Sequence, residues 1–157
     1  MIKYSVFTKP WKTLPLDELA QFVHETGFDG VEFPVRPDFQ VEPQNIREGL
    51  PAAAETFAKY GVSIYSVAGN TDEATIRACA EAGVPMIRTM AAIPAEQPYM
   101  ATVADLQNSY KSLQPLLKET GVKIGVQNHF GRYVSNAMGL HHLLLPLDAA
   151  CYCAVLD

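Results

Sequence analysis

The sequence predicts an α/β protein whose parallel strands form a β/α barrel. Helix-like segments end in glycine, and a short apolar run follows at once; this order recurs along the whole chain. Strict alternation of this kind is typical of parallel sheets with right-handed crossovers. No glycine-rich phosphate motif follows the first apolar run, which favours a barrel over a dinucleotide-binding fold.

The expected elements follow from periodicity and from turn residues. Leu16, Leu19, Ala20 and Val23 recur at helical spacing, which predicts a first helix. Runs rich in Val, Ile and aromatic residues are typical of strands buried on both faces. The stretches 34–43 and 92–99 carry prolines and are expected to be β-to-α loops. The glycines that predict left-handed helix caps are Gly27, Gly61, Gly83 and Gly121. The expected strands comprise residues 2–7, 28–33, 62–67, 84–90, 122–127 and 151–156.

Composition restricts the class of protein. With 157 residues, 48% of them hydrophobic and 18% charged, the chain reads as a single globular domain spanning residues 1–157. Its net charge of −5 argues against a nucleic-acid partner, and no apolar run is long enough to cross a membrane. The start of the chain lacks a signal peptide, so we expect a cytoplasmic protein. Cys79, Cys151 and Cys153 suit a reducing compartment; the close pair could serve a soft metal, but small buried residues are the better interpretation.

Polar side chains gather where the fifth expected strand ends. Gln127, Asn128 and His129 follow an apolar run directly, and alternation places Gln127 and His129 on the face opposite Ile124 and Val126. In β/α barrels the chemistry lies at the carboxyl ends of the strands. The polar tip therefore predicts a site, although a histidine taken alone is more often a packed residue than a catalyst.

Three further strands carry a polar residue that alternates with apolar neighbours. These are Glu32, Arg88 and, at the end of the last run, Asp157. Glu32 could instead pair with Arg36 or Arg88, and Trp11 could be either a surface aromatic or part of a pocket mouth. Strand parity predicts that one group converges in a single cavity: Glu32, Arg88, Gln127, His129 and Asp157.

The motifs GFDGVEF and GVQNHFG, together with an Asp that ends the sixth strand, resemble the sugar phosphate isomerase/epimerase family. These proteins are xylose isomerase-like TIM barrels, and they share their fold with zinc endonucleases that act at abasic sites. A complete barrel takes about 250 residues, so the resemblance implies an incomplete barrel of about six of the eight β/α units. It also implies a divalent metal (Mn, Mg, Zn or Co) at Gln127 and Asp157. The other implied roles are catalysis by Glu32 and His129 and substrate binding by Arg88, Asn128 and Trp11.

The expected function is metal-assisted isomerisation or epimerisation of a small sugar, polyol or sugar phosphate. Gln127 stands where the family usually has Glu, so it offers a neutral oxygen and cannot exchange protons. Strands seven and eight of the family, which carry the other metal ligands, have no counterpart here, so the isolated 157-residue form is expected to be nearly inactive and to bind metal weakly. We expect it either to self-associate through its exposed edge strands or to be a piece of a longer chain whose remaining strands close the barrel. The alternatives are phosphodiester hydrolysis at damaged DNA and a non-catalytic barrel.

Overall fold

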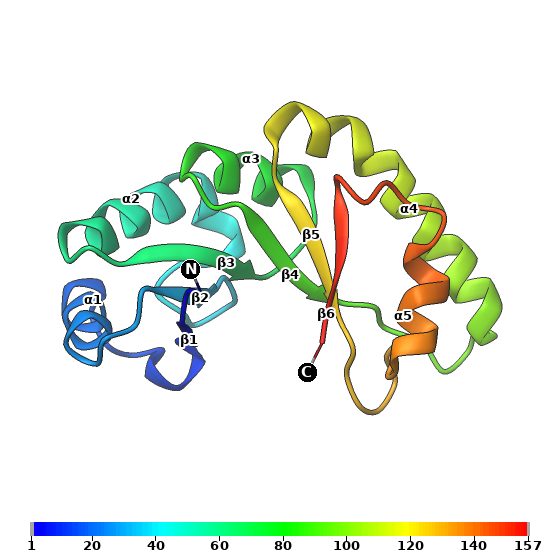
Figure 1. Cartoon of the computed structure of the whole chain (residues 1–157), viewed down its shortest axis with the longest axis horizontal. Helices are drawn as coiled ribbons and strands as arrows, with labels where there is room; N and C mark the ends of the chain where they lie inside the picture. Colours follow the sequence, from blue (N-terminus) through cyan, green and yellow to red (C-terminus); the bar gives the residue numbers. More distant parts are fainter. Residues whose placement is uncertain (1, 157) are drawn as a thin grey trace. The chain divides into compact units, whose positions relative to one another are not determined.

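The computed structural model describes residues 2–156. Its strands form a six-stranded sheet in the order β1-β2-β3-β4-β5-β6 (Figure 1). The strands are β1 (Ser5–Phe7), β2 (Gly30–Pro34), β3 (Ser63–Ala68), β4 (Met86–Met90), β5 (Lys123–Gln127) and β6 (Tyr152–Val155). The helices are α1 (Leu16–Glu25), α2 (Ile46–Lys59), α3 (Glu73–Glu81), α4 (Tyr99–Thr120) and α5 (Ala137–Leu144), with short 3-10 turns η1 (Lys9–Trp11) and η2 (Pro43–Asn45).

The strand order establishes the fold class. Each strand lies beside its neighbours in sequence, and the pairs β1–β2, β2–β3 and β5–β6 are parallel. A doubly wound sheet would reverse its strand order at a switch point, whereas a barrel keeps the order of the chain. The sheet is therefore a partial β/α barrel of the TIM type, as the sequence predicts.

Glycines end four of the segments that precede strands, as expected from the sequence. Each adopts the left-handed conformation that side-chain-bearing residues disfavour, with φ between 68° and 80°. A Cβ at any of them would meet nothing within 4 Å, so the backbone angle alone demands glycine. These residues are Gly27, Gly61, Gly83 and Gly121.

The chain comprises two compact units, Met1–Ile87 and Arg88–Asp157. In the first unit, α2 lies between α1 and α3 (Figure 1). Phe33 of β2 packs edge-on against Phe57 of α2, with ring centroids 5.7 Å apart, and both side chains are fully buried. Burying two aromatic rings removes a large apolar area from water and fixes the helix on the sheet.

The first strand is shorter than the sequence suggests. Strand pairing begins at Ser5, opposite Gly30, and the apolar Ile2 and Tyr4 remain 75% and 65% exposed. The reason is local: the Tyr4 backbone exchanges hydrogen bonds with Asp29, whose carboxylate and N–H lie before β2 begins. The hydrogen bond from the Tyr4 N–H to the Asp29 carboxylate, together with the hydrogen bond from the Lys3 ammonium, holds the pKa of the Asp29 carboxyl below its usual value.

The second unit places α4 and α5 beside β5 and β6 (Figure 1). Tyr152 of β6 donates its hydroxyl hydrogen to the Tyr110 carbonyl at 2.6 Å, and the two rings stack at 5.3 Å. Burial raises the pKa of the Tyr110 phenol to about 12, so that group stays neutral and serves packing. Among the described residues no helix is both long and apolar enough to cross a membrane.

Replacing Gly30 with alanine is expected to destabilise the protein by about 1–3 kcal/mol. A Cβ there would lie 2.5 Å from the Ser63 carbonyl oxygen and 2.6 Å from the Tyr65 ring, and the backbone oxygen cannot move aside. Gly69 is the matched control, because a Cβ there meets only ordinary contacts at 3.4 Å. Urea denaturation followed by circular dichroism measures both changes; equal stability of Gly30→Ala and Gly69→Ala would contradict the expected clash.

Candidate functional site

The polar tip of the second unit lies where β5 ends. Gln127 is the last residue of the strand, and the Asn128 N–H donates to the Val155 carbonyl at 3.4 Å, so pairing with the β6 segment continues one residue further. Gln127, Asn128 and His129 are all half-buried. Arg88, on β4, is only 6% exposed. Because the effective dielectric constant is low at a buried position, the Arg88 guanidinium interacts more strongly with an anionic group there than it would in water.

His129 is held by its neighbours on three sides. Its Nδ1 lies 2.9 Å from the Phe130 carbonyl oxygen. Its ring stacks on Phe130, with centroids 4.6 Å apart and planes inclined by 26°, and it meets the Tyr133 ring edge-on at 5.0 Å. The imidazole therefore has a defined orientation at the strand end, which a functional side chain requires.

In the first unit Glu32 lies at the centre of β2, between the fully buried Val31 and Phe33. The Ser66 hydroxyl of β3 donates to Glu32 Oε2 at 3.1 Å, and the two residues are paired in the strand register. Glu32 itself is half-buried. Its alternative partner Arg36 lies with its guanidinium 5.9 Å from the Phe7 ring centroid.

Trp11 follows β1 in η1 and is half-buried rather than a free surface aromatic. Its ring packs on Phe22 of α1 at 5.0 Å. Gln40 anchors this turn, because its amide N–H₂ donates to the carbonyls of Trp11 and Leu14 at 2.8 and 3.0 Å. Among the described residues, the Gln40 Oε1 atom is the one buried side-chain polar atom with no hydrogen-bond partner.

The structure thus groups the predicted residues by unit. Trp11 and Glu32 belong to the first, and Arg88 and the β5 tip belong to the second. Asp157 lies outside the described residues. The convergence of both groups on one cavity stays a prediction. Sequence reasoning missed Ser66 and Gln40, and the only signal for Ser66 was its alternation with the buried Val67 along β3.

The residues that the structure describes do not by themselves make a tight divalent-metal site. Within residues 2–156, no three His, Cys, Asp or Glu side chains lie together as a ligand group. Gln127 supplies a neutral amide oxygen where a carboxylate would neutralise the cation. The cysteines do not compensate: all three are free thiols, and burial raises the pKa of Cys79 to about 12 and raises those of Cys151 and Cys153. A thiol that stays protonated is a poor metal ligand.

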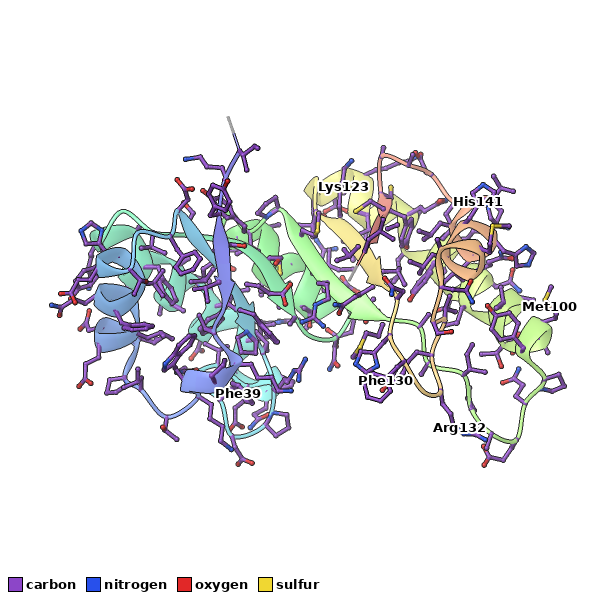
Figure 2. The ribbon with its side chains drawn as sticks, turned by 60° about the horizontal axis from the view of Figure 1, so that its bottom comes forward. Phe39, Met100, Lys123, Phe130, Arg132 and His141 are labelled. Carbon is purple, nitrogen blue, oxygen red and sulfur yellow. The ribbon has the colours of Figure 1, made fainter. Side chains whose placement is uncertain are left out.

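An apolar cavity of about 450 Å³ lies elsewhere in the second unit, on α5 and β6. His141, labelled in Figure 2, contributes to its wall from α5. Most of its wall is aliphatic, and the ionisable side chains in it are His141, Tyr152 and Cys153. The walls are formed chiefly by Leu140, Leu144, Leu145, Tyr152, Cys153 and Leu156.

Comparison with known proteins bears on the fold. No family model and no curated protein matches the sequence. Many solved structures match nearly the whole chain, and three of them illustrate the likeness. D-psicose 3-epimerase with D-tagatose from Clostridium cellulolyticum H10 is 13% identical, with a TM-score of 0.77, and the match covers 99% of this chain and 63% of that one. The IolI protein with a bound zinc atom is 14% identical, with a TM-score of 0.76 over 99% and 63% of the two chains.

The third structure is an AP endonuclease of family 2 from Brucella melitensis, 13% identical, with a TM-score of 0.72 over 100% of this chain and 69% of that one. The chain therefore spans about two thirds of the length of these proteins. Other matches include a sugar phosphate isomerase/epimerase from Parabacteroides distasonis. The structural neighbours thus include members of the family that the motifs resemble, and the chain has the fold of the xylose isomerase-like TIM barrels.

Proposed function

We propose that this chain is a sugar-binding β/α-barrel protein of the isomerase and epimerase kind. The observation that carries the proposal is the placement of Gln127, Asn128 and His129 at the carboxyl end of β5, in a sheet with barrel strand order. That is where barrel enzymes place their reactive groups. The substrate class, a small sugar or polyol, is supported by the epimerases among the structural neighbours.

Glu32 is the proposed base. Isomerisation and epimerisation beside a carbonyl both begin when a base removes the proton from the neighbouring carbon. Ser66 donates to one carboxylate oxygen of Glu32, and this hydrogen bond fixes the orientation of the side chain. The proton moves to Glu32, and the electron pair of the broken C–H bond moves into the enediolate.

Arg88 and Asn128 are proposed to stabilise the negative oxygen that then develops. The guanidinium of Arg88 is nearly excluded from water, and a charge-assisted hydrogen bond is strongest in such surroundings. Asn128 offers amide N–H groups at the strand tip, and His129 offers a ring nitrogen to a substrate hydroxyl. Gln127 and Asp157 are the positions at which a metal was expected, but a neutral amide holds a cation weakly.

Gln127 limits what the chain can complete. Epimerisation needs a second group that returns a proton to the opposite face of the enediolate, and an amide cannot act as an acid or a base at neutral pH. The proposed outcome is reversible proton removal by Glu32 without efficient inversion. Net conversion of the sugar by this chain should therefore be far slower than exchange of its proton with solvent.

Deuterium exchange tests the proposal. The 157-residue chain is incubated with a panel of ketoses in D₂O, with and without Mn²⁺ or Mg²⁺, and the C–H signal beside the carbonyl is followed by NMR. Exchange above the buffer rate, with little new sugar formed, supports the proposal. Exchange at the buffer rate for every sugar, in both metal conditions, would favour a non-catalytic barrel.

Phosphodiester hydrolysis at damaged DNA is a second candidate, favoured by the AP endonuclease among the structural neighbours. The composition argues against DNA hydrolysis, because the chain has 12 Lys and Arg residues but 17 Asp and Glu residues. Binding to DNA phosphates needs a basic surface. Incubation with an oligonucleotide that contains one abasic site separates the two functions. Strand cleavage at that site would replace the sugar proposal.

A further inference from the structure

The loop that follows β5 is fixed to the segment that follows β4. The Val134 N–H donates to the Ala91 carbonyl at 2.9 Å, and the Ile93 N–H donates to the Arg132 carbonyl at 2.8 Å. Val134 and Ala91 are both fully buried, so the bond between these two residues is shielded from water. The loop is therefore held by an isolated antiparallel bridge between Ala92 and Tyr133 rather than being a free excursion.

This loop presents an aromatic ring to solvent. Phe130 is 82% exposed, although burying such a ring would normally contribute about 1.5–3 kcal/mol. Figure 2 shows it on one side of the loop, with Arg132 on the other. Leu145 and Leu156, which are also strongly exposed in this unit, line the cavity on α5 and β6, whereas Phe130 is not among the residues of its wall.

The contacts of His129 determine which of its nitrogens is available. A backbone carbonyl can only accept a hydrogen bond, so Nδ1, at 2.9 Å from the Phe130 oxygen, carries the hydrogen. In the neutral imidazole the other nitrogen, Nε2, then has a lone pair and accepts hydrogen bonds. The adjacent residues His129 and Phe130 thus supply an oriented acceptor nitrogen and an exposed aromatic ring.

These two features match the two kinds of surface on a sugar. One face of a sugar ring is lined by C–H groups, which pack on an aromatic ring, and its edge carries hydroxyl donors. Ligand sites combine apolar walls with a few placed polar groups in this way. We propose that Phe130 and His129 form a sugar-stacking platform, in which the C–H face lies on the Phe130 ring and one hydroxyl donates to His129 Nε2. The proposal rests on the sugar substrate class of the proposed function and adds Phe130 as a binding residue.

The platform also explains why the loop is held rigidly. A stacking ring contributes most when its rotamer is fixed before the ligand arrives, because little entropy is lost on binding. Phe130 stacks on His129, which in turn meets Tyr133, so the three rings restrain one another. A ring mounted on a mobile loop would lose much of that advantage.

Saturation-transfer NMR on the full 157-residue chain tests the platform, with a panel of ketoses and their polyols as probes. Saturating the aromatic protons should mark the C–H protons of a bound sugar, and Phe130→Ala should abolish that transfer and raise Kd by about three- to tenfold. Phe130→Trp should preserve both. His129→Phe, which keeps the stacking ring but removes the nitrogen acceptor, should also weaken binding. Met138→Ala is the matched control, because Met138 is 77% exposed in the same unit but lies outside the loop.

The outcomes separate this inference from the proposed function. Binding that depends on Phe130, without deuterium exchange, would retain the platform and reject the catalytic proposal. Exchange with the same KM in wild type and Phe130→Ala would reject the platform and retain the catalytic proposal. If no probe binds, or if Phe130→Ala and Met138→Ala bind sugar equally well, the platform is wrong.

Discussion

Replacing Glu32 with glutamine is expected to reduce deuterium exchange beside the sugar carbonyl to the rate in buffer. Gln keeps the shape of Glu and can still contact the Ser66 hydroxyl, but it cannot accept the proton from carbon. A positioned general base accelerates such a step by about 10²–10⁴-fold. If the wild-type chain exchanges the proton faster than buffer by no more than this factor, exchange in Glu32→Gln should fall to the buffer rate. The measurement is the NMR decay of the C–H signal in D₂O.

Ser66→Ala is the matched control for Glu32→Gln. It removes only the hydroxyl that donates to Glu32 Oε2 at 3.1 Å, and a single hydrogen bond of this kind contributes about 1 kcal/mol, or roughly fivefold in rate. Exchange should therefore slow but persist. Circular dichroism of both variants checks that the sheet is intact. An unchanged exchange rate in folded Glu32→Gln would show that another group is the base.

The purified 157-residue chain is expected to self-associate through the α5–β6 face, and the double variant Leu145→Glu, Leu156→Glu is expected to be monomeric. β6 lies at the end of the sheet order and pairs with β5 on one side. Leu145 and Leu156, 70% and 73% exposed, adjoin the apolar cavity there. An uncharged edge strand beside an apolar surface is a ready template for association.

The expected effect is large because each leucine contributes about 1.5–3 kcal/mol when it is buried, and each glutamate would place a charge in an apolar interface. The dissociation constant for self-association should therefore be more than about a hundredfold higher in the double variant than in the wild-type chain. Sedimentation velocity over a wide concentration range gives the mass. Met100→Glu is the control, because Met100 is 58% exposed at the start of α4 and does not line the cavity. A wild-type chain that stays monomeric at every concentration would contradict this prediction.

Much of the fold was predictable because it rests on local rules. The left-handed glycines mark helix ends whatever surrounds them, and all four have the positive φ that their positions predicted. The buried strands follow from their composition, and Ile124 and Val126 are fully buried as alternation predicts. With strands and helices in strict order, short crossovers leave few arrangements other than sequential neighbours.

The candidate site was predictable only in part. The sequence indicated the polar β5 tip because Gln127, Asn128 and His129 adjoin one another in the chain. It could not indicate that Ser66 would donate to Glu32, because those residues are 34 positions apart and meet only through the register of β2 and β3. Register depends on the pairing of whole strands, which local pattern does not specify.

The sequence by itself determined the order of the elements, the helix caps and the identity of the polar residues at the strand ends. Only the tertiary structure decided what each of those residues touches. In the structure β1 comprises only Ser5–Phe7, because the Tyr4 N–H donates to the Asp29 carboxylate. The Trp11 ring packs against Phe22, which the sequence did not indicate. The tertiary structure also tied the His129 loop to the segment after β4 and left Phe130 exposed. Periodicity reports which face of an element is buried, whereas a contact between distant segments depends on how the elements pack.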